Sequence, residues 1–335
     1  MKRKSLYFVG PGQVDIREEE LGAPGAGEVL VRGLGSLISA GTEMLLYRGE
    51  MPEGMQSDEM LPALQGLLRY PLKYGYSMVG EVLEAGPEVD AQWRGKRVFA
   101  FNPHESAFIA SVDDLQTLPE GCETEDAAFL ANMETAVNLM LEAGARLGER
   151  VVVIGQGVLG LLCTALLARH PLGALLTVEP VAGRRKLSEA LGAEQSLGAE
   201  ALEAVRERLG PRGADLVIEL SGRPEALTEA LELVGREGRV VVGSWYGTRQ
   251  AALGLGGRFH REHIQLISSH VGTIPPGLRG RWDRARRFEQ AWEMVAALRP
   301  GQLVTHRFGI EAAGEAYGML DLDGEGAMGV VISYQ

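Results

Sequence analysis

The sequence predicts an α/β fold in which a doubly wound parallel-sheet domain is inserted into a β-rich domain. Strand and helix patterns alternate between residues 151 and 267, which is typical of a parallel sheet covered on both faces. Residues 1 to about 115 instead contain short strands separated by turn residues. The chain has 335 residues, more than one hydrophobic core usually supports, so we expect two domains.

The β-rich part contains three clear strand patterns before any long helix, at residues 29–39, 78–85 and 97–101. No long helical period is predicted before residue 123. From residue 126 onward, apolar residues recur at three- and four-residue spacing and predict a helix. Its apolar stripe consists of Phe129, Met133, Ala136, Met140 and Leu141.

The alternating part predicts strands at residues 151–154, 175–178, 215–220, 239–243 and 264–267. Helices are predicted between them at residues 158–169, 183–191, 200–209 and 224–234. A helix at 282–298 and a strand at 329–333 form a tail that returns to the first domain. We therefore place the β-rich domain at residues 1–132 plus 269–335, and the parallel-sheet domain at residues 133–268.

Composition and charge exclude several classes of protein. The formal net charge of -12 argues against a nucleic-acid partner, which requires a basic surface. Two cysteines, Cys122 and Cys163, make a disulfide framework improbable and favour a reducing compartment, so we expect the cytoplasm. The apolar stretch at 151–168 imitates a membrane span, but its three glycines lie where a buried strand turns into a buried helix. We therefore expect no membrane partner.

A glycine motif follows the first strand of the alternating part. Gly155-Gln156-Gly157-Val158-Leu159-Gly160 matches G-x-G-x-x-G between the strand at 151–154 and an apolar helix. This is the Rossmann arrangement, in which amides at a helix N-terminus face a pyrophosphate. Gly155 permits the tight turn, Gly157 lets the backbone approach the phosphates, and Gly160 allows the helix and strand to pack closely. We expect Val158 and Leu159 to contribute amides to the same site.

An acidic residue ends the next strand. Glu179 lies near the spacing of about 20 residues at which a carboxylate accepts hydrogen bonds from the adenosine ribose. A carboxylate there repels a 2'-phosphate, which favours NAD over NADP, although Arg184 and Arg185 follow closely. Alternatively, the glycines only shape a strand-helix turn and Glu179 only caps the next helix.

These landmarks resemble the medium-chain dehydrogenase/reductase superfamily over nearly the whole chain. The similar segments are 39–43 (Ser-Ala-Gly-Thr-Glu), 75–82 (Gly-Tyr-Ser-Met-Val-Gly-Glu-Val), 95–98 (Gly-Lys-Arg-Val), the glycine motif and 191–193 (Leu-Gly-Ala). Segments 46–49 and 73–76 look most similar to the bacteriochlorophyllide dehydrogenase branch. The resemblance implies a GroES-like catalytic domain with an inserted Rossmann domain, and a homodimer or homotetramer.

The sequence departs from the zinc-dependent members at each expected catalytic ligand. Ala40 stands where they carry Cys, Tyr76 and Ser77 stand where they carry His and Glu, and Ala131 lies near the third ligand. A catalytic zinc site needs three protein ligands, and alanine supplies none. A four-cysteine structural site is excluded because the chain has two cysteines. We therefore expect no zinc.

Without zinc, hydrogen-bond donors must stabilise the substrate oxygen. Tyr76 is the first candidate, and Thr42, where many relatives place a relay hydroxyl, is the second. His104 is the third, because a histidine transfers protons near neutral pH. Alternatively, Tyr76 fills the space left by the zinc ligands and His104 is a turn residue. Glu43 and Glu134 are expected to be structural, although these two with His104 would form a rearranged metal site.

The family resemblance also implies that several other residues lie near the cofactor. Thr135 matches the position that packs against nicotinamide, and Ser221 with Gly222 matches a turn near the ribose. Gly243 ends a strand at the edge where doubly wound sheets bind ligands. Arg184 begins its helix within reach of the ribose.

The arginine run at 279–287 is basic within an acidic chain. Such a run is either a solvated helix face or a site for an anionic substrate group, with Arg286 and Arg287 as its test positions.

Taken together, the sequence predicts an NAD(P)(H)-dependent oxidoreductase, with NAD favoured, that transfers a hydride between nicotinamide and a secondary alcohol or ketone. One alternative is an NAD(P)H-dependent reductase of enones or quinones. Another is a dinucleotide-binding sensor without turnover.

Overall fold

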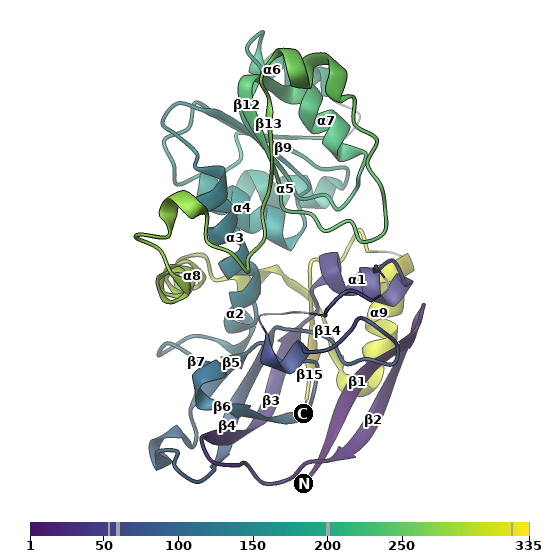
Figure 1. Cartoon of the computed structure of the whole chain (residues 1–335), viewed down its shortest axis with the longest axis vertical. Helices are drawn as coiled ribbons and strands as arrows, with labels where there is room; N and C mark the ends of the chain where they lie inside the picture. Colours follow the sequence, from purple (N-terminus) through teal and green to yellow (C-terminus); the bar gives the residue numbers. More distant parts are fainter. Residues whose placement is uncertain (53, 58–60, 199–201, 323, 335) are drawn as a thin grey trace. The chain divides into compact units, whose positions relative to one another are not determined.

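The chain divides into two units, which we describe separately. The computed structural model describes residues 1–52, 54–57, 61–198, 202–322 and 324–334 (Figure 1). Unit 1 comprises Met1–Ala131 with Met294–Gln335, and unit 2 comprises Asn132–Glu293. The first boundary lies within one residue of the expected one. The second lies 25 residues beyond the expected 268, because the first part of the helix at 284–298 packs in unit 2.

Unit 2 is built on a six-stranded parallel sheet. Its strands are β8 Arg150–Ile154, β9 Ala174–Val178, β10 Gln195–Leu197, β11 Ala214–Glu219, β12 Val234–Val242 and β13 Gln265–Ser268. Their order across the sheet is β10-β9-β8-β11-β12-β13, and every neighbouring pair is parallel. Numbered from β8, this is the 3-2-1-4-5-6 order of the Rossmann fold. The predicted doubly wound fold is confirmed.

Helices connect successive strands from β8 to β12 (Figure 1). They are α4 Val158–Leu167, α5 Ala182–Ala190, α6 Leu202–Leu209 and α7 Ala226–Leu233, while α3 Leu130–Ala143 precedes β8 and α8 Arg284–Leu298 follows β13. The predicted start of α6 falls outside the described residues. Eight of the ten residues of α4 are buried, and the strand before it, β8, is buried as well. No helix among the described residues is long and apolar enough to cross a membrane, and the stretch at 151–168 is split between β8 and α4.

Unit 1 contains a β-hairpin and a seven-stranded sheet. The hairpin pairs β1 Lys2–Gly10 with β2 Gln13–Glu20. The sheet contains β3 Glu28–Leu37, β4 Met78–Ala85, β5 Arg97–Ala100, β6 Ala107–Ser111, β7 Leu115–Thr117, β14 Val304–Gly309 and β15 Gly329–Ser333. The C-terminal strand β15, in yellow, pairs with β3 near the start of the chain (Figure 1). The tail thus returns to the first unit, as predicted.

The described residues of unit 1 also form the whole helices α1 Ala40–Arg48, α2 Thr124–Ala128 and α9 Ala313–Leu322. No long helical period was predicted before residue 123, and the short helix α1, of nine residues, forms directly after β3. Its first turn carries Glu43, its last turn carries Arg48, and Gly49 ends it with a φ of 72°. These are favourable charges and a favourable residue for the two ends of a helix.

Short helical turns occur in both units. They are η1 Pro62–Leu64, η2 Ala91–Trp93, η3 Val112–Asp114, η5 Leu255–Phe259, η6 Pro276–Leu278, η7 Pro300–Leu303 and η8 Ile310–Ala312.

Candidate functional site

The glycine turn of unit 2 has the geometry that each glycine predicts. Gly155 has a φ of 91°, and a Cβ there would lie 2.6 Å from the backbone N of Ser221. A Cβ on Gly160 would lie 2.0 Å from the carbonyl oxygen of Gly155, so only glycine lets α4 pack this closely on the turn. A Cβ on Gly157 would meet no atom within 4 Å. Two glycines are therefore required by packing, whereas Gly157 borders open space.

The N-terminus of α4 leaves amide groups for a ligand. Gly157 is its N-cap, and no side chain caps this end. The first amides of a helix lack intrahelical partners, so those of Val158, Leu159 and Gly160 face the space beside Gly157. A diphosphate accepts such bonds and is favoured by the helix dipole. The residues present therefore fit a dinucleotide.

Glu179 holds the glycine turn from the next strand. Its carboxylate accepts hydrogen bonds from the amides of Gln156 (2.7 Å) and Val181 (3.0 Å), and the residue is 3% exposed. The expectation of a carboxylate at this edge of the sheet fits, but its two oxygens already bind main-chain amides. Since each carboxylate oxygen accepts more than one hydrogen bond, a ribose hydroxyl remains compatible with this geometry.

A second buried carboxylate, Glu219, organises the neighbouring turns and was missed by the sequence analysis. One of its oxygens accepts from the amide (2.7 Å) and hydroxyl (2.5 Å) of Ser221, and the other accepts from the hydroxyl of Tyr246. The hydroxyl of Ser244 accepts a hydrogen bond from the amide of Gly222 (2.9 Å). Burial, together with Glu219, raises the pKa of Tyr246 above its usual range. Ser221 is thus held where its backbone meets Gly155.

The remaining expected cofactor residues also lie in unit 2. Thr135 is half-buried on α3, and Arg184 is half-buried on the first turn of α5. Gly243 directly follows β12, and a Cβ there would lie 2.6 Å from a methyl group of Leu220. Arg185 donates to the carbonyl oxygens of Glu179 (2.9 Å) and Pro180 (2.6 Å), so it is already engaged with the backbone.

Three hydroxyl groups meet in unit 1. The phenol of Tyr76 donates to the hydroxyl of Ser39 and lies 3.2 Å from that of Thr42. Tyr76 and Thr42 are half-buried, and Ser39 is 8% exposed. We call Ser39, Thr42 and Tyr76 the hydroxyl cluster. The structure therefore brings the first two candidate donors together and adds Ser39, which the sequence analysis did not single out.

His104 lies apart from this cluster and is fully buried. Its Nε2 is 2.9 Å from Oε2 of Glu43, and its Nδ1 is 2.6 Å from the hydroxyl of Ser36. Glu43 is also fully buried, and its other oxygen accepts from the amide of Ser39 (2.7 Å). Because His104 has no exposed surface, it does not have the position expected of a proton donor to substrate.

Two further tyrosines complete the surroundings of this pair. Tyr317 donates to Oε2 of Glu43, and the hydroxyl of Tyr334 lies 2.6 Å from that of Ser36. Burial, with Glu43 nearby, raises the pKa of Tyr317 well above its usual range, so its phenol stays protonated as a donor. Burial likewise raises the pKa of Tyr334.

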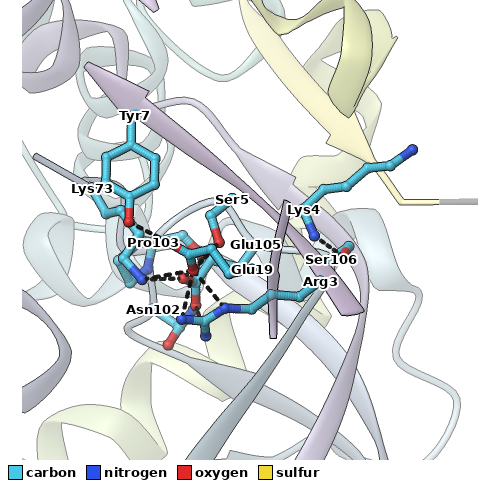
Figure 2. Close-up of polar contacts among 10 residues, drawn as sticks. All are labelled: Arg3, Lys4, Ser5, Tyr7, Glu19, Lys73, Asn102, Pro103, Glu105 and Ser106. Atoms are coloured by element: carbon cyan, nitrogen blue, oxygen red, sulfur yellow. Dashed lines mark hydrogen bonds and ion pairs between the residues drawn. The ribbon is translucent and has the colours of Figure 1, made fainter. Parts of the chain in front are cut away.

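An ion network fixes the loop that carries His104 (Figure 2). Glu105 accepts from Lys73 (2.7 Å), Ser5 (3.1 Å), Asn102 (3.0 Å) and Arg3 (3.2 Å). Figure 2 shows these side chains converging with Glu19 and Tyr7 of the hairpin. Burial opposes ionisation of Glu19, but hydrogen bonds from Tyr7 and Ser5 and the charge of Lys73 lower its pKa to about 2.

The arginine run does not present all of its charges to solvent. Arg287 is 4% exposed, and its Nη2 lies 2.6 Å from Glu134 while its Nη1 lies 2.8 Å from Asn138. Burial raises the pKa of Glu134, although Arg287 opposes this effect. The expectation that Arg287 meets a substrate is therefore wrong, whereas Arg286 is exposed and lies over the ring of Trp282.

The residues present do not fit the usual catalytic zinc. Ala40 and Ala131 carry no donor atom, and the phenol of Tyr76 is bonded within the hydroxyl cluster. Within the described part of the chain, no three His, Cys, Asp or Glu side chains gather where they could hold a metal ion. The rearranged site of Glu43, His104 and Glu134 does not form, since Glu134 pairs with Arg287.

Comparison with known proteins agrees with the fold and the nucleotide turn. Residues 159–296 match the family model described as zinc-binding dehydrogenase. D-guloside 3-dehydrogenase from Escherichia coli K12 is 25% identical, over 87% of this chain and 88% of that protein.

Two solved structures share the architecture. A short-chain alcohol dehydrogenase (rspB) from Escherichia coli CFT073, complexed with NADH, has a TM-score of 0.80 at 18% identity, with 99% of each chain covered. A structure from Sinorhizobium meliloti 1021, assigned there to zinc-binding dehydrogenases and bound to NADP, has a TM-score of 0.78 at 20% identity, again with 99% of each chain covered. At these identities the likeness shows the fold.

The Rossmann sheet, its glycine turn and the β-rich unit define a two-domain dehydrogenase of the medium-chain type. Residues 159–296 belong to the zinc-binding dehydrogenase family, and over most of its length the chain is similar to dehydrogenases of the alcohol dehydrogenase-like, medium-chain type. The narrower resemblance to the bacteriochlorophyllide dehydrogenase branch stays a prediction.

Proposed function

We propose that this protein is an NAD(H)-preferring oxidoreductase that interconverts a secondary alcohol and its ketone without the catalytic zinc of its family. The observation that carries this proposal is the hydroxyl cluster, in which Tyr76, at a position where zinc-dependent relatives have a ligand, is hydrogen-bonded to Ser39 and Thr42. The nucleotide turn of unit 2 would bind the hydride carrier, because the open space beside Gly157 and the first amides of α4 suit a dinucleotide.

The cofactor is held by unit 2 in this proposal. Main-chain amides of Val158, Leu159 and Gly160 bind the diphosphate, and Glu179 accepts from the adenosine ribose. Thr135, Arg184, Ser221 and Gly243 line the rest of the same site. The preference for NAD rests on Glu179, because its carboxylate disfavours a 2'-phosphate, and on Arg185, which is engaged with backbone carbonyls.

The nicotinamide ring accepts or gives the hydride when it is bound. The proton of the alcohol hydroxyl must leave as the carbon-hydrogen bond breaks, and it returns in the reverse direction. Tyr76 takes up this proton as it passes its own phenolic proton to the hydroxyl of Thr42, which is half-buried and exchanges it with solvent; the reverse transfers return the proton during ketone reduction. The hydroxyls of Ser39 and Thr42 can then accept from Tyr76 or donate to it without a change in backbone position.

The charge stabilisation that two hydrogen-bond donors supply can be compared with that of a zinc ion. A Lewis-acidic metal supplies several kcal/mol of charge stabilisation, whereas one well-placed hydrogen-bond donor supplies about 3 to 4 kcal/mol. Two donors, Tyr76 and Thr42, therefore approach the effect of the metal. Turnover slower than that of zinc-dependent relatives is expected.

The relative from Escherichia coli K12 is named for dehydrogenation at position 3 of a D-guloside, where a pyranoside carries a secondary hydroxyl. This supports a secondary alcohol or ketone. The exposed arginines Arg279, Arg281, Arg284 and Arg286 favour substrates that carry an anionic group.

Turnover separates this proposal from the two alternatives. We would follow NADH absorbance in the full chain with secondary alcohols, ketones, enones and quinones, using Tyr76→Phe and Thr42→Ala as variants. The proposal expects ketone reduction that falls at least tenfold in Tyr76→Phe, with the KM for NADH unchanged. Enone or quinone turnover alone supports the reductase, and binding without any turnover supports the sensor. Unchanged ketone rates in both variants would refute the assignment of the donors.

We also propose that the protein forms a homodimer or homotetramer in the cytoplasm. β13 is an edge strand of the parallel sheet, and three of its four residues are exposed, including Leu266 at 38%. Exposed edges of this kind pair readily with a second copy. Light scattering should give a multiple of the chain mass that Leu266→Lys reduces, and a monomer at micromolar concentration would contradict the proposal.

A further inference from the structure

We infer that His104 and Glu43 form a buried positioning pair that fixes the hydroxyl of Tyr76, rather than acting on substrate themselves. The catalytic consequence rests on the proposed function, in which Tyr76 exchanges a proton with the substrate oxygen. The structural part stands on three contacts: two join the pair to the hydroxyl cluster, and the third joins the two members of the pair.

The first contact runs through Ser39. This residue is the N-cap of α1, a position where a serine side chain normally accepts from a helix amide, yet here it makes no such bond. Instead, Glu43 accepts the amide of Ser39 at 2.7 Å, and the Ser39 hydroxyl receives the phenol of Tyr76. Glu43 thus holds the backbone of Ser39, and the side chain of Ser39 remains available to accept the hydrogen bond from Tyr76.

The second contact runs through Gly75, the residue before Tyr76. Gly75 has a φ of 119°, and a Cβ on it would lie 2.7 Å from both Cδ2 and Nε2 of His104. The backbone that carries Tyr76 therefore rests directly on the imidazole ring. A ring of different shape or tilt would displace this turn and the phenol beyond it.

The third contact joins the two members of the pair. Nε2 of His104 and the hydroxyl of Tyr317 both reach Oε2 of Glu43, and Ser36 holds Nδ1 of His104 from the other side. Each of these groups is completely buried or nearly so. In such surroundings a carboxylate keeps a single arrangement, because any unmatched donor or acceptor costs about 1 to 3 kcal/mol.

The loop around His104 has little freedom of its own. Its neighbours Asn102 and Glu105 are bonded to each other, and Glu105 is held by Lys73 and Arg3 (Figure 2). Lys73 lies two residues before Gly75, so the same network anchors both the histidine loop and the turn that leads to Tyr76. The pair therefore sits between two fixed segments.

The test uses the full chain and a readout that does not depend on activity. Protein labelled with 13Cζ-tyrosine reports the environment of each phenol, and Tyr76→Phe identifies the signal of Tyr76. We expect His104→Leu to move that signal, His104→Gln to restore it because the amide can still donate to Glu43, and His306→Leu to leave it unchanged as the matched control. An unmoved Tyr76 signal in His104→Leu would overturn the inference.

Kinetics then test the positioning role where the protein turns over a ketone. His104→Leu should lower kcat at least tenfold and leave the KM for NADH within twofold of the wild-type value. His104→Gln should recover most of the rate. In a Tyr76→Phe background, His104→Leu should lower kcat no further. Equal losses in both backgrounds would refute action through Tyr76. If His104→Leu does not fold, Glu43→Gln carries the same two tests. If the wild-type chain turns over nothing, the proposed function fails, while the tyrosine signals still decide the positioning pair.

Discussion

Two glycines of the nucleotide turn provide a matched pair of substitutions with opposite expected effects. Gly160→Ala places a Cβ 2.0 Å from the carbonyl oxygen of Gly155, whereas ordinary contacts begin near 3.4 Å. The first turn of α4 must therefore move by about the difference between these distances. Overpacking of this kind costs about 1 to 3 kcal/mol, which corresponds to a fall in Tm of about 3 to 10 °C for a unit of this size.

Gly157→Ala meets no atom within 4 Å and has a φ of -70°, which alanine adopts freely. The folded protein should be unchanged or more stable by about 0.4 to 1 kcal/mol, because alanine restricts the unfolded chain. The added methyl group occupies the space through which a diphosphate approaches the backbone. We therefore expect the Kd for NADH to rise at least tenfold, about 1.4 kcal/mol.

Thermal unfolding followed by fluorimetry and NADH fluorescence titration measure these two quantities on the same samples. The reasoning about the site fails if Gly157→Ala binds NADH as tightly as the wild type. The reasoning about packing fails if Gly160→Ala unfolds at the wild-type temperature.

Three further predictions concern stability. Glu179→Gln should lower the Tm and weaken NADH binding, since a buried amide at Gln156 or Val181 loses its acceptor at a cost of about 1 to 3 kcal/mol; equal Tm values would contradict the role of Glu179 in the turn. Arg287→Met leaves the buried Glu134 unpaired and should lower the free energy of unfolding in urea by about 3 to 5 kcal/mol. Arg286→Met, at an exposed position, should lower it by less than about 1 kcal/mol. Similar values for the two variants would be inconsistent with the buried pair. The folded-state pKa of Glu19 is about 2, below its usual 4.5, so its contribution to the free energy of unfolding is complete above pH 4.5 and is lost as the pH falls toward 2. Glu19→Gln should therefore reduce the dependence of the free energy of unfolding on pH in this range. An unaltered slope would exclude the contribution of Glu19.

The sequence predicts the nucleotide-binding half well because its signals are local. The strand before Gly155, the three glycines and the apolar helix after them lie within 20 residues, and each has a direct conformational consequence. The helix α1 was missed because its apolar residues, from Met44 to Tyr47, are consecutive and show no helical spacing. The strands β10 and β14 and the helix α9 were also not predicted.

The hydroxyl cluster and its support depend on contacts between distant segments. His104 meets Glu43 across 61 positions, and Arg287 meets Glu134 across 153 positions. No local pattern specifies such pairs, so Ser39 and Glu219 were not anticipated and Arg287 was assigned to the surface. Members of the hydroxyl cluster could be predicted only from the family resemblance, as for Tyr76, which replaces a zinc ligand of the relatives.

Calorimetric titration of the full chain with nicotinamide dinucleotides, after extensive dialysis against a chelator, tests the central claim most directly. Saturable binding of one NADH per chain, at least tenfold tighter than NADPH, is the result that the account predicts. An absence of binding for oxidised and reduced forms of both nucleotides would contradict it.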